Sequence, residues 1–166
     1  MARIIITGAS DGIGAEMARQ LAQTHGSRLQ LTLAARNAGN LLAVAEQCRA
    51  LGAQVLEVPT DVSEEAQCRA LIDAAVQQFS GLDALINNAS LFRYDTLATL
   101  TEASWDEHLA SNLTAPVFLI RDFARAIEAA DGQGVVVNIL DHKVDSPNPD
   151  FFAYTAGKVG LAGLTR

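Results

Sequence analysis

Short, wholly apolar runs alternate along the chain with longer stretches in which apolar residues recur every three or four positions. The first pattern is typical of strands buried on both faces of a sheet, and the second of amphipathic helices. We expect strands at Arg3–Thr7, Leu29–Ala34, Gln54–Val58, Asp83–Asn87 and Val135–Leu140. Helical patterns follow them, so the sequence predicts a doubly wound parallel sheet with helices on both faces, in one domain of residues 1–166.

The helical stretches show faces that we expect to pack on this sheet. The predicted inward faces are Ile13, Met17 and Leu21 in the first helix, Leu41, Val44, Ala45 and Cys48 in the second, and Cys68, Leu71, Ile72, Ala75, Val76 and Phe79 in the third. A short helix is predicted over Thr101–Ser111 with Trp105 and Leu109 inward, and a separate one begins near Asn112. The last helix begins at Phe151, after a loop over Asp141–Asp150.

The charge and composition of the chain argue against several kinds of binding partner and site. The formal charge of −7 argues against a nucleic-acid-binding surface and against binding to an anionic membrane. No apolar run is long enough to span a bilayer, and Ile4–Ile6 is too short for a signal peptide. Cys48 and Cys68 fall among apolar helix positions, which favours a buried reduced pair over a disulfide or a metal site. We therefore expect a cytoplasmic protein without a metal centre.

The turn after the first strand has the composition of a phosphate-binding loop. Its glycines let the backbone turn sharply and approach a ligand closely. The helix that follows presents free N–H groups and the positive end of its dipole, which suit a pyrophosphate. We expect this turn to bind a dinucleotide. Its residues are Gly8, Ser10, Asp11, Gly12, Ile13 and Gly14.

The residues after the second and third strands bear on which dinucleotide is bound. NAD-binding folds often place a carboxylate near Arg36 for the ribose 2′-hydroxyl, whereas an arginine suits the 2′-phosphate of NADP. The alternative for Arg36 is an ordinary solvated charge. Asp61 and Val62 follow the third strand, where Asp61 can accept from an adenine amino group or cap the next helix. The sequence thus favours NADP(H) over NAD(H).

Tyr154 and Lys158 are four residues apart in the last predicted helix and therefore share one helix face. A phenol titrates near pH ~10 and is by itself a poor proton donor at neutral pH. Because a nearby ammonium favours the phenolate, we expect Lys158 to lower the pKa of Tyr154. Such a pair would serve as a general acid. The alternative is an exposed tyrosine and lysine without a function.

These features occur together with the run Asn87-Asn88-Ala89 and with Asn112. In this order and spacing they resemble the motifs of the short-chain dehydrogenase/reductase family, which has a Rossmann fold. The resemblance implies that Tyr154 donates the proton, Lys158 holds the nicotinamide ribose and Asn112 supports a proton relay through water. The implied NADP(H)-binding residues are Gly8, Ser10, Asp11, Gly12, Ile13, Gly14, Arg36, Asp61, Val62, Asn88, Ala89, Ser90, Tyr154 and Lys158.

Asp141 departs from the common family pattern, in which a serine stands thirteen residues before the tyrosine. Together with Ser90 and Phe92 it resembles the pteridine reductase and dihydromonapterin reductase branch. In that branch the aspartate and the tyrosine protonate a pterin ring nitrogen together, and the aromatic residue stacks on the pterin. That branch commonly has an arginine in the glycine turn, where this chain has Gly12. The substrate-binding residues implied are Ser90, Phe92, Asp141 and Tyr154.

The residue types fit that chemistry, because a carboxylate can accept two N–H groups of a pterin but repels a ketone oxygen. We therefore expect an NADPH-dependent reductase of a pterin-like C=N bond. Two alternatives stay open: a ketone reductase or alcohol dehydrogenase of the same family, and a non-catalytic NADP(H)-binding module. In the second alternative, Asp141 would be only a loop residue.

The chain ends at Arg166, within the helix that bears Tyr154 and Lys158, whereas family members continue through further strands. The resemblance therefore implies a domain that lacks the last strands of the family, either because the form is truncated or because a C-terminal part is not included. It also implies a homodimer or homotetramer formed through the helices that begin near Asn112 and Phe151.

Overall fold

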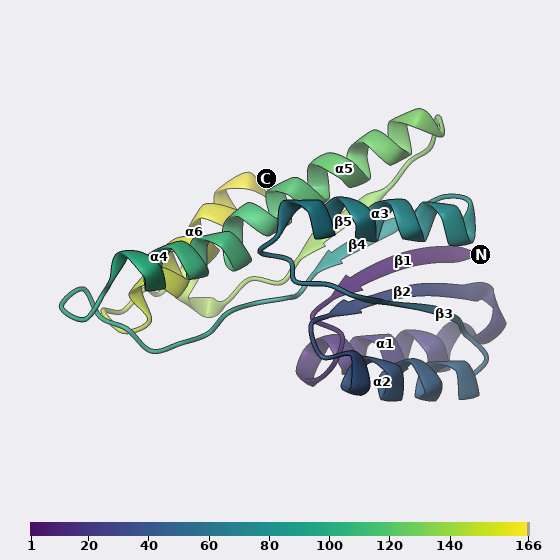
Figure 1. Cartoon of the computed structure of the whole chain (residues 1–166), viewed down its shortest axis with the longest axis horizontal. Helices are drawn as coiled ribbons and strands as arrows, with labels where there is room; N and C mark the ends of the chain where they lie inside the picture. The colour runs from purple at the N-terminus through teal and green to yellow at the C-terminus, as the bar shows by residue number, and fades with distance from the viewer. Residues whose placement is uncertain (166) are drawn as a thin grey trace.

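The computed structural model describes residues 1–165 and contains a five-stranded parallel sheet with the strand order β3-β2-β1-β4-β5 (Figure 1). The chain moves outward from β1 to β3 and then returns to place β4 on the other side of β1. Ligands of doubly wound sheets bind where the strand order reverses in this way, at the carboxyl ends of the strands. The strands are β1 Ala2–Thr7, β2 Leu29–Ala35, β3 Gln54–Pro59, β4 Ala84–Asn87 and β5 Val135–Asn138.

Helices cover both faces of the sheet, as the sequence predicted. Figure 1 shows α1 and α2 on one face and α3 and α5 on the other. The remaining helices, α4 and α6, pack together beyond the carboxyl ends of the strands. The helices are α1 Gly12–His25, α2 Ala38–Ala50, α3 Glu65–Phe79, α4 Glu102–Leu109, α5 Ala115–Ala129 and α6 Phe152–Leu164.

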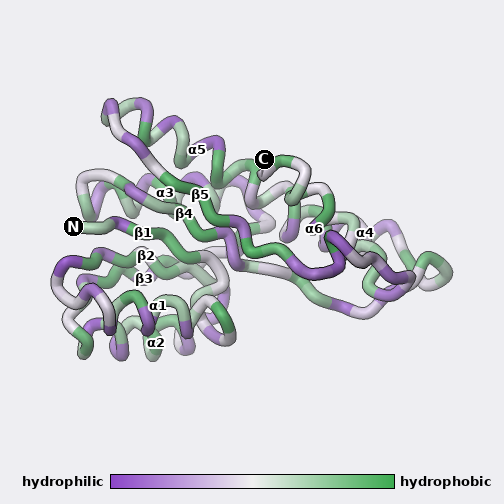
Figure 2. The backbone as a smooth tube through the Cα atoms, turned by 180° about the vertical axis from the view of Figure 1, so that it is seen from behind, coloured by the Kyte–Doolittle hydropathy of each residue, from purple (hydrophilic) through white to green (hydrophobic). Residues whose placement is uncertain are grey.

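Two apolar cores follow from the alternation of side chains along the strands. Ile6 packs with the helices α1 and α2, whereas its neighbour Ile5 packs with α3 and α5, and both are 0% exposed. The apolar strands run through the middle of the molecule in Figure 2. Burial of each such side chain contributes about 1.5–3 kcal/mol, so the central strands form a rigid base for the loops at their carboxyl ends.

The predicted inward faces of α2 and α3 are confirmed, with Val76 only half-buried. The prediction for α1 is wrong at Ile13, which is 64% exposed. The buried face of α1 consists of Gly14, Ala15, Ala18 and Ala22, while Met17 and Leu21 flank it and are half-buried. Small side chains let α1 approach the sheet closely, and the larger residues therefore lie to the sides.

Residues Glu102–Ala129 form one continuous helix and not the two separate helices that were expected. A π-helical segment, Ala110–Thr114, joins α4 to α5 and contains Asn112. Such segments are rare and often occur at functional sites. Cys48 and Cys68 are buried free thiols. None of the helices described within residues 1–165 has the length and apolar character needed to cross a bilayer.

Candidate active site

The glycine turn holds its shape through close backbone packing. Gly8 and Gly12 have φ angles of +66° and +52°, which favour glycine. A Cβ on Gly14 would lie 2.3 Å from the carbonyl oxygen of Gly8 and 2.5 Å from Nδ2 of Asn88, so no side chain fits there. At Gly12 a Cβ would meet nothing within 4 Å. Gly8 and Gly14 are therefore required by the packing of the turn, whereas Gly12 faces open space.

Asn88 supports this turn from the end of β4. Its Nδ2 donates to the carbonyl oxygens of Thr7 at 2.9 Å and Gly8 at 3.1 Å. The Thr7 hydroxyl accepts in return from the backbone N–H groups of Asn88 at 3.0 Å and Ala89 at 3.1 Å. The amide of Asn88 is thus bonded to the backbone that forms the turn. These contacts of Thr7 were not predicted from the sequence, because its partners lie more than 80 residues away.

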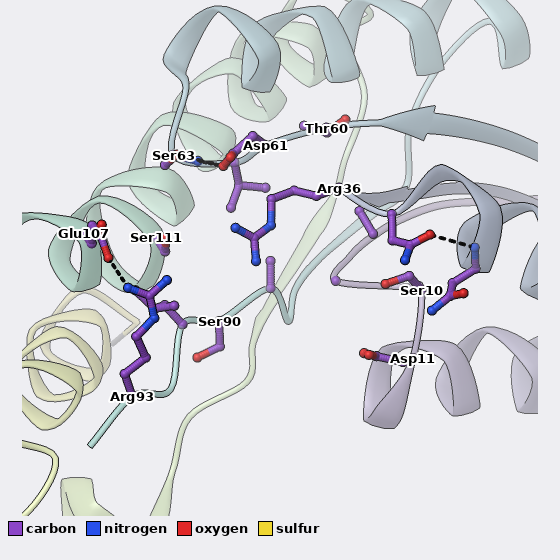
Figure 3. A pocket seen from close by; sticks show the side chains of 17 residues that line it. Ser10, Asp11, Arg36, Thr60, Asp61, Ser63, Ser90, Arg93, Glu107 and Ser111 are labelled. Atoms are coloured by element: carbon purple, nitrogen blue, oxygen red, sulfur yellow. Dashed lines mark hydrogen bonds and ion pairs between the residues drawn. The ribbon is translucent and has the colours of Figure 1, made fainter. Parts of the chain in front are cut away.

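A cavity of about 570 Å³ runs along the carboxyl ends of the strands, next to the glycine turn (Figure 3). The predicted residues that line it are Gly8, Ser10, Asp11, Arg36, Asp61, Val62, Ala89 and Ser90. The sequence reasoning missed Asn37, Asn40, Arg93, Glu107 and Ser111. The predicted Gly12, Ile13, Gly14, Asn88, Tyr154 and Lys158 are not among its lining residues.

The cavity fits a dinucleotide in size and in chemistry. Its volume falls within the range of about 300–1,000 Å³ that is usual for small-molecule and cofactor sites. One wall is the turn before α1, and the guanidinium of Arg36 points into the opening from the end of β2 (Figure 3). Asn37 caps α2 by accepting from the backbone N–H of Asn40 at 3.0 Å. A helix N-terminus and a cation together suit an anionic group.

Asp61 forms a local turn before α3. Its Oδ1 accepts from the Ser63 hydroxyl at 2.7 Å and from the Ser63 backbone N–H at 3.0 Å. The bond from the Ser63 hydroxyl lowers the pKa of Asp61 most, and the charge of Arg36 adds to that effect. The N-cap residue of α3 is Glu64, so of the two alternatives given for Asp61 the structure does not support the one in which it caps this helix.

The Tyr154 hydroxyl donates to Oδ2 of Asp141 at 2.9 Å. Burial of the phenol, with the Asp141 carboxylate beside it, raises the pKa of Tyr154. The backbone N–H of Lys143, which donates to Oδ1 of Asp141 at 2.9 Å, lowers the pKa of Asp141 most, and the Tyr154 hydroxyl lowers it further. The pair therefore keeps its proton on Tyr154.

Lys158 does not act on Tyr154 as expected. Its Nζ donates to the carbonyl oxygen of Ile139 at 2.7 Å and lies 5.8 Å from the centroid of the Tyr154 ring. Burial lowers the pKa of Lys158 itself. The expectation that Lys158 lowers the pKa of Tyr154 is wrong in this structure, because burial and the carboxylate of Asp141 outweigh the ammonium.

Asn112 is fully buried, and its side chain anchors the segment after β4. Its Oδ1 accepts from the Ser90 hydroxyl at 3.0 Å and from the Leu91 backbone N–H at 2.8 Å, while its Nδ2 donates to the Leu91 carbonyl oxygen at 2.9 Å. The buried His108 accepts from the backbone N–H of Arg93 at 3.4 Å. Asn112 and Ser90 are thus bonded to each other, and the helix fixes the loop at several points.

An aromatic wall stands next to Tyr154. The Phe92 and Phe151 rings are stacked, with centroids 4.2 Å apart and planes 6° apart. The Phe92 ring also meets the Tyr154 ring edge to face at 4.7 Å, and Phe92 is 56% exposed. Sequence reasoning singled out Phe92 but missed Phe151, although an aromatic residue beside a polar loop was a signal for it. Phe92, Phe151 and Tyr154 thus form one aromatic cluster.

Comparisons with known proteins agree with this architecture. The sequence profile of the short chain dehydrogenase family matches residues 2–166. The chain is 34% identical over 167 residues to dehydrogenase/reductase SDR family member 11 of Bos taurus, with 97% of this chain and 64% of that protein covered. It is 32% identical over 162 residues to the 3-oxoacyl-acyl-carrier-protein reductase FabG of Staphylococcus aureus (strain Mu50), with 98% and 65% covered.

A solved structure of a short-chain oxidoreductase is also similar to this chain. A metagenomic short-chain oxidoreductase in complex with NADP superposes with a TM-score of 0.89 at 35% identity, with 98% of this chain and 72% of that chain covered. The chain spans 64% and 65% of the lengths of the two curated relatives named above. Since the family profile covers almost all of its residues, the chain belongs to the short-chain dehydrogenase/reductase family.

Proposed function

We propose that this short-chain oxidoreductase uses NADP(H) to reduce a pterin-like C=N bond. The observation that carries the proposal is the hydrogen bond of 2.9 Å between the Tyr154 hydroxyl and Asp141, with the Phe92 ring 4.7 Å from Tyr154. A proton donor, a hydrogen-bond acceptor and a stacking surface thus meet at one place. Together they match a planar heterocycle that has both ring nitrogens and N–H groups.

In the proposed reaction, NADPH supplies a hydride when it is bound. That hydride would go to the carbon of the C=N bond, while the nitrogen takes the hydroxyl proton of Tyr154, so that the bond would gain two hydrogens and Tyr154 would become a phenolate. Tyr154 carries this proton at neutral pH before the reaction, as a phenol does, and burial beside Asp141 favours the protonated form further. The phenolate then recovers its proton from solvent.

Asp141 and Phe92 orient the substrate in this proposal. The pKa of Asp141 is lowered, so its carboxylate is ionised at neutral pH and accepts hydrogen bonds from the amino and ring N–H groups of a pterin. The exposed Phe92 ring stacks on the heterocycle. Lys158 has a separate role in this proposal, because its buried ammonium, which is bonded to the Ile139 carbonyl oxygen, can also hold a ribose hydroxyl of the cofactor.

Arg36 and the N-terminus of α2 support the choice of NADP(H) over NAD(H). The 2′-phosphate carries negative charge that the guanidinium can bind in a bidentate way. Asn40, in the first turn of α2, lines the same cavity and offers an amide donor. The experiment is a comparison of the binding constants of NADPH and NADH by titration calorimetry, and we expect NADPH to bind at least tenfold more tightly.

Reduction of a ketone is the second candidate, and the similarity to a 3-oxoacyl reductase favours it. An ionised carboxylate at Asp141 disfavours it, since a ketone oxygen has no proton to donate. The test is steady-state NADPH oxidation, followed by absorbance, with a dihydropterin and with a 3-oxoacyl ester as the two substrates. A higher kcat/KM for the dihydropterin supports our proposal, and the reverse order supports the ketone.

We further propose a cytoplasmic homodimer or homotetramer. The two buried free thiols are in keeping with a reducing compartment. Val117 on α5 and Val159 on α6 are 36% and 44% exposed, which is consistent with helix surfaces that pack against another copy. The mass in solution, measured by light scattering, tests this, and a monomer would contradict it.

A further inference from the structure

Asp95 lies in the irregular loop after β4 and reaches the N-terminus of α6. The residue is 4% exposed, and both of its carboxylate oxygens lie 3.3 Å from the backbone nitrogen of Ala153. Its own carbonyl oxygen accepts from the backbone N–H of Phe151 at 2.8 Å. Asp95 therefore holds the backbone N–H groups of Phe151, the N-cap residue of α6, and of Ala153, the second residue of that helix and 58 positions further along the chain.

The segment that Asp95 binds, at the start of α6, contains a strained residue. Phe151 has a φ of +58°, a left-handed conformation that is unfavourable for a bulky side chain. Its conformation is fixed from several sides, because its backbone N–H is bonded to Asp95 and its ring stacks on Phe92 at 4.2 Å. The Lys143 ammonium lies 5.3 Å from the same ring. Residues in such conformations persist where their surroundings determine them, and they cluster at active sites.

Tyr154 follows immediately, in the first turn of α6. Because Asp95 fixes the backbone of Phe151 and Ala153, it also sets the direction in which Tyr154 leaves the helix. We propose that Asp95 is a positioning residue, which holds Tyr154 against Asp141 and Phe151 against Phe92. The role of the tyrosine as the proton donor rests on the function proposed above, but the positioning itself can be observed without turnover.

The alternative is that Asp95 only stabilises a helix, as any cap does. The chain offers a matched control for this alternative. Thr101 is the N-cap residue of α4, and its hydroxyl accepts from the backbone N–H of Ser104 at 3.2 Å. Thr101 is exposed and lies outside the site, so Thr101→Ala removes a cap without touching the start of α6.

The experiment compares Asp95→Ala, Asp95→Asn and Thr101→Ala with the wild-type chain. Thermal unfolding, the binding constant of NADPH and kcat with a dihydropterin are measured for each. We expect Asp95→Ala to lower kcat at least tenfold with NADPH binding changed less than threefold. Asp95→Asn keeps an acceptor oxygen and should lower kcat two- to fivefold. Thr101→Ala should lower the unfolding temperature and keep kcat within twofold of wild type.

A second measurement does not need turnover. The chain has two tyrosines, so selective ¹³Cζ labelling gives two resonances, which Tyr94→Phe assigns. We expect the Tyr154 resonance to shift or broaden in Asp95→Ala and to stay unchanged in Thr101→Ala. If the wild-type chain reduces no substrate, the proposed function fails, while this resonance still tests the positioning.

An Asp95→Ala variant with the wild-type kcat and the wild-type Tyr154 resonance would overturn the proposal. The proposal would also be overturned if Asp95→Ala lowered kcat no more than Thr101→Ala does while the two variants lost equal stability. If Asp95→Ala does not fold, Asp95→Asn decides alone, and an unchanged Tyr154 resonance in that variant overturns the proposal.

Discussion

The hydroxyl of Tyr154 donates a hydrogen bond of 2.9 Å to Oδ2 of Asp141. The pKa of Tyr154 is raised because the phenol is buried beside the negative charge of Asp141. The pKa of Asp141 is lowered because its carboxylate accepts hydrogen bonds from the Lys143 backbone N–H and from Tyr154. Two titratable groups with separated pKa values are a common basis for assigning an acid and its partner. Tyr154 is therefore the group that carries the proton, and Asp141 is the group that accepts hydrogen bonds.

Replacement of Asp141 separates the two candidate substrates. Asp141→Ser removes the acceptor for pterin N–H groups, and we expect kcat/KM with a dihydropterin to fall about 100-fold or more, because charge-assisted hydrogen bonds contribute about 1.5–3 kcal/mol each. Activity with a 3-oxoacyl ester should rise. Asp145→Ser, an exposed change in the same loop, is the control and should stay within twofold of wild type. Retained dihydropterin activity in Asp141→Ser would argue against the pterin assignment.

Replacement of Arg36 tests the choice of cofactor. Arg36→Leu removes the guanidinium that points into the cavity, so NADPH should bind about 10- to 100-fold more weakly, as expected for the loss of one charge-assisted hydrogen-bonded contact. NADH, which lacks the 2′-phosphate, should bind within threefold of the wild type. Arg28→Leu is the control, since Arg28 is an exposed residue before β2. If Arg36→Leu weakened the binding of NADPH and NADH equally, the result would contradict a contact between Arg36 and the 2′-phosphate.

The pH profile of kcat should report on Lys158 at its alkaline end. An ammonium is charged below its pKa, and burial lowers the pKa of Lys158 from its usual value of 10.5, so the charge is lost at a lower pH than usual. The pKa of Tyr154 is raised, so Tyr154 is still protonated there. Activity should therefore fall on the alkaline side through loss of the Lys158 charge. In Lys158→Arg this decline should move to higher pH, since arginine stays charged; an unmoved decline would assign it to another group.

The packing of the glycine turn predicts a difference between two glycine-to-alanine changes. A Cβ at Gly14 would lie 2.3 Å from the Gly8 carbonyl oxygen, so Gly14→Ala should lower the free energy of unfolding by about 2 kcal/mol or more. Gly163 lies in α6 with nothing within 4 Å of the added atom, and Gly163→Ala should raise that free energy by up to about 1 kcal/mol. Urea unfolding measures both, and equal midpoints would show that the turn tolerates a side chain.

Periodicity was enough to predict most of the fold. The apolar runs located all five strands of the sheet to within a few residues, and the helical spacing gave the buried faces of α2 and α3. The spacing of apolar residues could not reveal that α1 turns its alanines toward the sheet. Ala18 and Ile13 are both apolar, and the pattern does not say that the helix approaches the sheet so closely that only the smaller residue fits between them. It also could not reveal the π-helical segment at Asn112, which depends on a local change of hydrogen bonding.

Less of the candidate site than of the fold could be predicted from the sequence. The glycine turn and Arg36 could be identified from their place after strands, and Arg36 lines the cavity together with Gly8, Ser10 and Asp11 of the turn. The pKa of Tyr154 was predicted with the wrong sign, because the spacing to Lys158 says nothing about burial or about where the ammonium points. The contact between Asp95 and Ala153 joins residues 58 positions apart, and no local pattern marks it.

The most direct test is NADPH consumption with a dihydropterin by the wild-type chain and by Tyr154→Phe. The substitution removes the proton donor and keeps the ring, so kcat should fall about 100- to 10,000-fold, the usual contribution of a general acid, while the NADPH binding constant stays within twofold. Tyr94→Phe is the matched control, since Tyr94 is 65% exposed and its hydroxyl donates to Oδ1 of Asp150 at 3.1 Å, and this variant should keep kcat within threefold. A Tyr154→Phe variant that consumes NADPH at the wild-type rate would contradict Tyr154 as the acid.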